Sequence, residues 1–243
     1  MLWRVAEIMI RSAAMSVVVA LTLVMPVAAS RAGAQQRAQP EGRGSDEVRI
    51  DRNRSHVVAI TDKAGLLGAL GHRHAVVATD WSAHILYNPN RPQDASVVVN
   101  VPVRALRIDS DRARDIAGLG SGPDAGTVAK LQEKMLGPQV LDAERYPTIA
   151  FRSTAVDTAP QGGLIVRGAL MLHGHSGRVD VPVHTQRLET GATRFSGELT
   201  VRQSNYGIEP ESIAGVVKVA DPVAIRFDIV TVPDAAKAAP HSR

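Results

Sequence analysis

The sequence alternates between apolar and polar residues over six separate segments, and this period of two constrains the fold more than any other feature. Residues 179–183 illustrate it, because Val179, Val181 and Val183 are separated by Asp180 and Pro182. Five further segments follow the same pattern: 77–85, 96–104, 164–172, 195–202 and 223–230. Successive side chains of a β-strand point to opposite faces of its sheet. Each segment therefore predicts a strand with one apolar face and one mostly polar face.

Strands of this kind belong to an antiparallel sheet, because parallel α/β sheets have near-continuous apolar strands that alternate with helices. Short turn sequences rich in Gly, Asn, Pro and Ser separate the segments and are typical of hairpins; they occupy residues 88–90, 161–163, 174–177 and 190–192. A long meander has two unpaired edges, and closure into a barrel removes them. The pattern predicts an all-β protein with a closed antiparallel barrel.

One segment has helical spacing instead. Val128, Leu131 and Met135 fall on one side of a helix over residues 127–136, and Gly137 and Pro138 stop it. We expect this short helix to cover one end or side of the barrel. The preceding stretch, 109–126, is charged and then glycine-rich, which predicts a long mobile connection.

Gly118, Gly120 and Gly122 in that stretch have the first spacing of a dinucleotide-binding loop. Pro123 stands where the third glycine of that pattern belongs, and no apolar strand leads into the motif. We therefore interpret these glycines as a loop without a phosphate.

Residues 1–34 have the organisation of a secretory signal peptide. Arg4 and Arg11 supply the positive region, residues 12–30 are apolar, and Ala32-Gly33-Ala34 is a small-x-small cleavage site. The alternative is a transmembrane anchor, since the apolar run is nearly long enough to span a bilayer. Pro26 and the cleavage site favour removal. We expect a periplasmic or secreted protein without stable membrane insertion: a signal peptide over 1–34, a flexible linker over 35–46, a barrel domain over 47–233 and a disordered tail over 234–243.

Composition excludes several kinds of function. The chain has no cysteine, so it has no disulfide, no thiolate metal site and no cysteine nucleophile. Its basic residues are scattered, which does not fit a nucleic-acid partner. It contains neither a nucleophile elbow nor a zinc-protease helix motif, and we expect no catalysis and no cofactor.

Two pairs of histidines carry the remaining chemistry. His72 and His74, and also His173 and His175, are two residues apart, so within a strand each pair shares a face and could chelate a metal. Both pairs lie beside glycine at strand ends, and neither includes a carboxylate. We predict no metal site, and keep a histidine-bound metal or haem as an alternative.

Residues 136–155 contain Tyr146-Pro147 followed by Phe151, Ser153 and Thr154, and residues 168–174 read Gly-Ala-Leu-Met-Leu-His-Gly. These blocks resemble the YceI-like family: the first is similar to its helix exit, tyrosine-proline corner and following strand, and the second to its Gly-x-Leu-Thr-Leu-x-Gly hairpin. Weaker similarity covers 71–72, 81–83, 181–183, 202–208 and 218–221. The order and spacing of these blocks, rather than any single block, carry the resemblance, which spans about residues 47–232. The chain looks like a member of a divergent branch of the family.

The resemblance implies an extended antiparallel eight-stranded β-barrel of lipocalin-like architecture with one short helix. It also implies a periplasmic or secreted location and, from characterised relatives, a long polyisoprenoid chain inside the barrel. We therefore expect an exported, non-catalytic binding protein for a lipid-like ligand, either a polyisoprenoid or another long apolar molecule. The alternatives are a packed barrel acting as a stress or interaction scaffold, and a histidine-dependent metal or haem accessory protein. The sequence leaves a homodimer open.

The candidate ligand-binding residues are those on the apolar phase of their strands: Val77, Trp81, Ala83, Ile85, Val99, Val101, Phe151, Leu170, Leu199 and Phe227. An eight-stranded barrel is just wide enough for its own side chains or for one slender ligand. Ala83, Ser153, Gly168 and Gly197 are small and are expected to point inward, which leaves room in the lumen. Trp81 could either line the cavity or fill the core.

We predict that the signal peptide is cleaved after Ala34. Intact-mass analysis of protein from the periplasmic fraction should show a chain that starts at Gln35. Recovery of only the full-length chain, in the membrane fraction, would instead establish the anchor.

Overall fold

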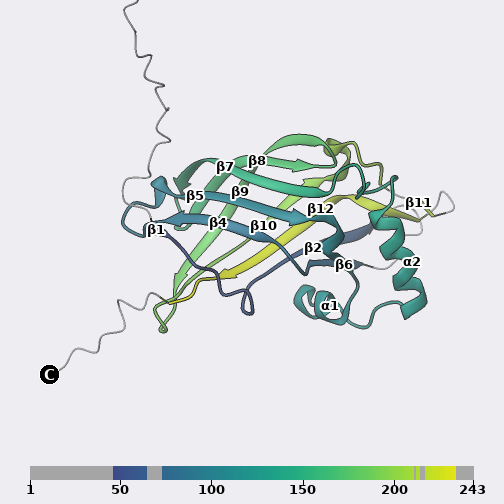
Figure 1. The fold of residues 1–243 in the computed structure, drawn as a ribbon, viewed down its shortest axis with the longest axis horizontal. Coiled ribbons are helices and arrows are strands. Elements are labelled where there is room, and N and C mark those ends of the chain that lie inside the picture. The colour runs from purple at the N-terminus through teal and green to yellow at the C-terminus, as the bar shows by residue number, and fades with distance from the viewer. Residues whose placement is uncertain (1–45, 65–72, 211, 214–216, 234–243) are drawn as a thin grey trace, which may run out of the picture. The chain divides into compact units, whose positions relative to one another are not determined.

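The structure is a computed structural model, and it describes residues 46–64, 73–210, 212–213 and 217–233 (Figure 1). The expected signal peptide, nearly all of the linker, the tail and His72 lie outside the described residues.

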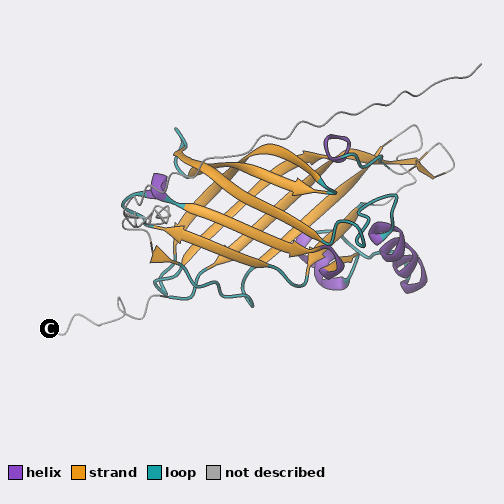
Figure 2. Ribbon diagram, turned by 45° about the horizontal axis from the view of Figure 1, so that its top comes forward, coloured by secondary structure: helices purple, strands orange, loops and turns teal. Residues whose placement is uncertain are grey.

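The described chain forms one antiparallel sheet of 12 strands that curls around an apolar interior (Figure 2). Along the sheet the order is β1-β4-β5-β7-β8-β9-β10-β12-β2-β3-β6, and β11 pairs with β12. The strands are β1 (Asp46–Glu47), β2 (His56–Ala64), β3 (His74–Ala78), β4 (Ser82–Tyr87), β5 (Ser96–Pro102), β6 (Leu106–Ile108), β7 (Thr148–Thr158), β8 (Leu164–Leu172), β9 (His175–Arg187), β10 (Thr193–Arg202), β11 (Ser212–Ile213) and β12 (Val217–Val230).

The expected all-β antiparallel class is confirmed, and the strand count differs for an identifiable reason. Two long segments are interrupted: β3 and β4 by residues 79–81, and β5 and β6 by a single 3-10 turn over Val103–Ala105. Counting each interrupted pair as one gives eight long segments, with the two-residue β1 and β11 added at the margins.

At each interruption the chain leaves one set of paired strands and joins another. β4 pairs with β1 and β5, whereas β3 pairs with β2 and β6. β9 is continuous but also changes partner along its length: it pairs with β8 over 175–183 and with β10 over 184–187. Between β1 and β2, the N–H of Val48 donates to the carbonyl of Ile85 in β4, and Ile50 forms an isolated β-bridge with Thr231, which directly follows β12. Residues 48–50 thereby connect β4 to the end of β12.

Two helices lie at the same end of the barrel, beside β6 (Figures 1 and 2). α2 (Ala125–Leu136) confirms the expected helix and starts two residues earlier, where the Asp124 carboxylate accepts from the N–H of Thr127. Leu131 and Met135 on its inner side pack against Val76 and Ile108.

The other helix, α1 (Asp111–Ala117), replaces part of the expected mobile connection. The Ser110 hydroxyl caps its N-terminus, and Gly118 ends it with a φ of +66°. Ala113 and Ala117 pack against Val58 and Val77 on the outer face of the sheet. A helix this short whose buried residues are mostly alanine has little apolar periodicity, which is why the sequence pattern does not reveal it.

The glycine-rich stretch after α1 is fixed around a guanidinium group. Arg114 donates from Nε to the carbonyl of Gly120 at 2.7 Å and from Nη2 to the carbonyl of Ser121 at 3.0 Å. A Cβ on Gly122 would lie 2.7 Å from the Arg114 Cδ. These carbonyls therefore bind a side chain of the protein itself, and the stretch is an ordered loop.

Arg114 is one of several donors to a buried carboxylate. Its Nη1 lies 2.8 Å from Oδ1 of Asp109, whose side chain is 0% exposed and which also accepts from the N–H of Ala75. His74 Nδ1 lies 2.5 Å from the other oxygen, Oδ2. Burial by itself raises the pKa of Asp109, but the hydrogen bonds from His74, Ala75 and Arg114 outweigh it and hold this pKa below its ordinary value. Ionised Asp109 thus stabilises the fold above its unfolded-state pKa, and this contribution is lost as the pH falls through the lower, folded-state pKa.

We predict that Arg114→Met lowers the free energy of unfolding by about 3–5 kcal/mol, because it leaves a buried carboxylate with fewer partners. Urea unfolding at neutral pH measures this. Arg107→Met is the matched control, since Arg107 is exposed and, within the described part of the chain, donates to the carbonyls of Arg104 and Leu106. The difference between the variants should shrink below about pH 4, the ordinary pKa of aspartate, as Asp109 becomes protonated. Equal losses in the two variants would contradict the assigned role.

Candidate ligand cavity

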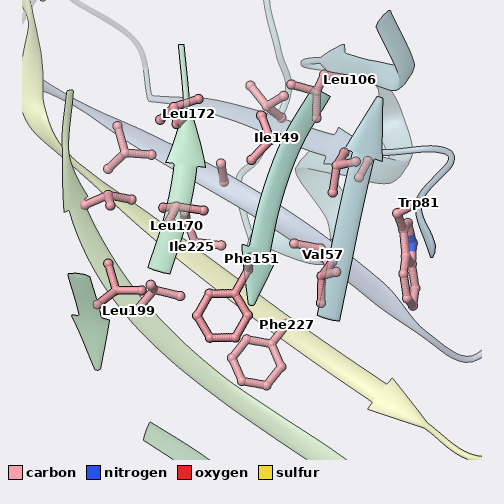
Figure 3. A pocket seen from close by; sticks show the side chains of 18 of the residues that line it. Val57, Trp81, Leu106, Ile149, Phe151, Leu170, Leu172, Leu199, Ile225 and Phe227 are labelled. Carbon is pink, nitrogen blue, oxygen red and sulfur yellow. The ribbon is translucent and has the colours of Figure 1, made fainter. Parts of the chain in front are cut away.

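The barrel encloses a cavity of about 450 Å³ (Figure 3). Its wall consists almost entirely of aliphatic and aromatic side chains from the inner face of the sheet, with Leu131 and Met135 of α2 contributing at the helical end. Period-two alternation produces this wall, because every second residue of a strand points to the same face. A cavity of this size falls within the roughly 300–1,000 Å³ range of sites that enclose small molecules.

Nine of the ten candidate residues line the cavity: Trp81, Ala83, Ile85, Val99, Val101, Phe151, Leu170, Leu199 and Phe227. Trp81, for which two roles were open, belongs to the cavity wall (Figure 3) and is only 5% exposed. The guanidinium of Arg52 covers its ring from 5.0 Å.

Val77 does not line the cavity, which corrects the expectation. It is buried on the opposite face of the sheet, among Val58, Ala113 and Ala117. The residues of β3 that line the cavity are Val76 and Ala78, together with His74. The expectation failed because residues 77–85 were interpreted as one strand, whereas residues 79–81 interrupt it and change which phase points inward.

The expected space at two glycines is also filled. A Cβ on Gly197 would lie 2.7 Å from Cζ of Phe227, and a Cβ on Gly168 would lie 2.5 Å from Cε2 of Phe151. The phenylalanine rings therefore occupy the room that the glycines provide. Ser153 is not open space either, because its hydroxyl accepts a hydrogen bond from the N–H of Val97 at 2.8 Å. Of the four small residues, only Ala83 lines the cavity.

Sequence reasoning missed one side of the wall, formed by Val57, Ala59 and Thr61 of β2. Alternation is hidden in this strand because Val58 and Ile60, between them, are buried as well. α1 covers the outer face of β2, so both faces are apolar. A continuous apolar run bounded by polar residues was the available signal, although such a run does not say which residues point inward.

Polar groups of the wall gather at one end of the cavity; they are Thr61, His74, Lys134, Arg202, Gln203 and Glu209. Register places several of them level on adjacent strands: Thr61 of β2 pairs with His74 of β3 and with Val223 of β12, and Arg202 of β10 pairs with Pro222 of β12. Lys134, Arg202 and Glu209 are exposed to solvent. The cavity therefore has a charged rim at one end and an apolar interior.

The second histidine pair serves the turn between β8 and β9. Nδ1 of His173 lies 3.1 Å from the carbonyl oxygen of Tyr206, and Nδ1 of His175 lies 2.9 Å from that of His173. The ring of Tyr146 meets His173 edge-on at 4.7 Å between centroids. Among the residues with a described position, no group of three or more His, Cys, Asp or Glu is arranged to hold a metal ion. None of the described helices has the length and apolarity needed to cross a bilayer.

A curled antiparallel barrel around an apolar cavity defines the structural class of this protein. The profile of the YceI-like domain matches residues 49–231, and the chain belongs to the YceI-like family. This confirms the resemblance seen in the sequence.

The chain is also similar to solved structures. Burkholderia cenocepacia BcnA has 20% sequence identity and a TM-score of 0.58, over 75% of this chain and 99% of BcnA. A YCEI protein of Campylobacter jejuni has 12% identity and a TM-score of 0.49, over 65% of this chain and 85% of that one. A polyisoprenoid-binding domain from Saccharophagus degradans, implicated in plant cell wall breakdown, has 12% identity and a TM-score of 0.49, over 79% of this chain and all of that one. No curated protein matches the chain.

We predict that Gly197→Ala lowers the free energy of unfolding by about 1–3 kcal/mol, the usual cost of overpacking, because the new methyl group meets the Phe227 ring and the carbonyl of Pro182. Gly120→Ala is the matched control, since a Cβ there meets nothing within 4 Å. Thermal unfolding of the two variants measures the difference. Similar melting temperatures would show that Phe227 can leave the space beside Gly197 without penalty.

Proposed function

We propose that this protein is an exported, non-catalytic binding protein that holds a long apolar molecule, a polyisoprenoid or another lipid-like chain, inside the barrel. The cavity carries this proposal: about 450 Å³ of space bounded by inward-facing aliphatic and aromatic side chains. Export is supported by the organisation of residues 1–34 as a signal peptide.

Apolar burial is enough to hold such a ligand. Each buried methylene contributes roughly 0.8 kcal/mol, so ten buried carbons contribute on the order of 8 kcal/mol before the costs of ordering the ligand. Micromolar binding therefore needs no charged or reactive group. This agrees with a chain in which no compact catalytic motif occurs.

The group nearest to a catalytic triad supports the non-catalytic proposal. His74 contacts Asp109, as the base of a triad contacts its carboxylate, and Thr61 is its neighbour across the strands. A triad also needs a hydrogen bond between the hydroxyl and the base, and Oγ1 of Thr61 makes none with His74 or any other described residue.

The packed-scaffold alternative is less well supported, because a scaffold barrel would fill its lumen with side chains. Phe151 and Phe227 do fill the space beside Gly168 and Gly197, yet the cavity persists around them. The metal or haem alternative draws no support from the described histidines, whose Nδ1 contacts include Asp109, Glu47 and backbone carbonyls.

We predict that Ala83→Phe strongly weakens ligand binding while changing the melting temperature little, because the new ring enters empty space. Titration with the fluorescent fatty acid cis-parinaric acid should show at least about tenfold weaker binding, which corresponds to about 1.4 kcal/mol. Ser82→Phe is the matched control, since Ser82 is the exposed neighbour of Ala83 on the same strand. Strong destabilisation by Ala83→Phe, in a protein whose wild type binds no probe, would show a solid barrel.

The natural ligand can be identified independently of any probe. Native mass spectrometry of protein purified from its own host should show added mass, and organic extraction should release a long-chain lipid. A protein that carries no lipid and binds no apolar probe would overturn the proposed function.

A further inference from the structure

One polar group of the cavity wall has no partner among the residues that the structure describes. Oγ1 of Thr61 is buried and makes no hydrogen bond with any of them. Thr61 follows Val57 and Ala59 on the inner phase of β2, and all three line the cavity. A buried hydroxyl without a partner costs folding free energy, and such groups are rare in native proteins. The isosteric valine would avoid that cost, so a threonine at this position indicates a hydrogen-bond partner that is not part of the described structure.

A second polar group lies directly beside it. His74 of β3 is the cross-strand partner of Thr61, lines the cavity and has a side chain that is 18% exposed. Its Nδ1 is engaged by Oδ2 of Asp109 at 2.5 Å. For Nε2, no partner is found among the residues whose positions are described. Thr61 and His74 thus present one hydroxyl and one ring nitrogen at the same end of the cavity.

The surroundings fix the orientation of the imidazole. Asp109 is itself held by Arg114 Nη1 at 2.8 Å and by the N–H of Ala75 at 3.1 Å, and its side chain is fully buried. A carboxylate in this position keeps a proton on Nδ1, and a neutral imidazole with that tautomer has an acceptor lone pair on Nε2. An aliphatic side chain would fill this part of the cavity wall without a buried ion pair behind it. The ion pair between Asp109 and Arg114 therefore indicates that the orientation of the imidazole matters.

Thr61 and His74 therefore match a ligand group that can both donate and accept a hydrogen bond. A hydroxyl donates to Nε2 of His74 and accepts from the hydroxyl of Thr61, whereas an ether oxygen only accepts and a hydrocarbon does neither. The charged rim residues Lys134, Arg202 and Glu209 are exposed to solvent, and the buried carboxylate behind His74, Asp109, is already paired with Arg114. A compact neutral head fits this end of the cavity better than an anionic one.

We propose that Thr61 and His74 form a head-group subsite that hydrogen-bonds the terminal hydroxyl of a long-chain alcohol, whose tail occupies the apolar remainder of the cavity. This inference rests on the proposed function and narrows it to one ligand class. Thr61 and His74 are positioned by the pairing of β2 with β3, and His74 is oriented by Asp109.

The test compares two probes with equal numbers of non-hydrogen atoms, 1-hexadecanol and 1-methoxypentadecane, by displacement of cis-parinaric acid. The wild-type protein should bind the alcohol about tenfold more tightly than the ether, the order expected for one or two hydrogen bonds. Thr61→Val should reduce this ratio to within about twofold of one, with little change in the affinity for the ether. His74→Phe should have the same effect on the ratio.

Thr200→Val is the matched control, because Thr200 is an exposed residue of β10; it should leave the ratio unchanged. Thr61→Val should also raise the melting temperature of the free protein relative to this control, since it removes an unpartnered buried hydroxyl. This readout keeps the test decisive if His74→Phe fails to fold for want of the contact with Asp109.

Equal binding of alcohol and ether by the wild type would overturn the subsite and leave the proposed function standing. The same conclusion follows if Thr61→Val keeps the wild-type preference. Failure of the wild type to bind either probe or cis-parinaric acid would instead overturn the proposed function, and the subsite with it.

Discussion

Hydrogen bonding between neighbouring antiparallel strands holds the inner face of the sheet in place, and the cavity depends on it. The pairing fixes which residues are level across strands, as with Thr61 and His74 or Gly197 and Phe227. A shift of one residue in any strand would turn its inward side chains outward. The apolar wall, the position of the polar groups at one end and the contacts of both helices all follow from this register.

Closing the curl imposes interruptions on the strands. The chain leaves one half of the barrel at residues 79–81 and again at the 3-10 turn over Val103–Ala105. Trp81 occupies the first of these breaks, where it lies between the cavity and the guanidinium of Arg52. At the other end of β3 and β6, Asp109 joins α1, through Arg114, to the wall residue His74. The same elements thus complete the fold and shape the site.

The cavity reflects a balance between packing and emptiness. The rings of Phe151 and Phe227 fill the space beside Gly168 and Gly197. Elsewhere in the wall, the small side chains of Ala83 and Ala59 leave space in the cavity. An empty volume forgoes dispersion contacts that side chains would otherwise make, which a ligand can restore. The hydroxyl of Thr61, which has no hydrogen-bond partner among the described residues, forgoes a hydrogen bond in the same way. Both features fit the ligand that we propose.

The sequence by itself determined the strand faces and thereby most of the cavity wall. Nine of the ten candidate residues line the cavity, because period-two alternation depends only on the local geometry of a strand. Motifs resembling a known family did the same for the fold, and the family match over residues 49–231 confirmed it. The helix over residues 127–136 was predictable for a similar reason, since its capping and spacing are local.

Tertiary structure decided what lies opposite each face. Val77 packs against α1 on the outer face of β3, because residues 79–81 interrupt the predicted strand and change which phase points inward; the alternation of one segment records neither the break nor the distant helix. Gly168 and Gly197 are small because rings from neighbouring strands need their space, which follows from pairing. Asp109 and His74 are 35 positions apart, and they meet only once β3 and β6 are paired. The local sequence specifies which side chains of a strand share a face, whereas contacts between residues of different elements form only in the folded chain.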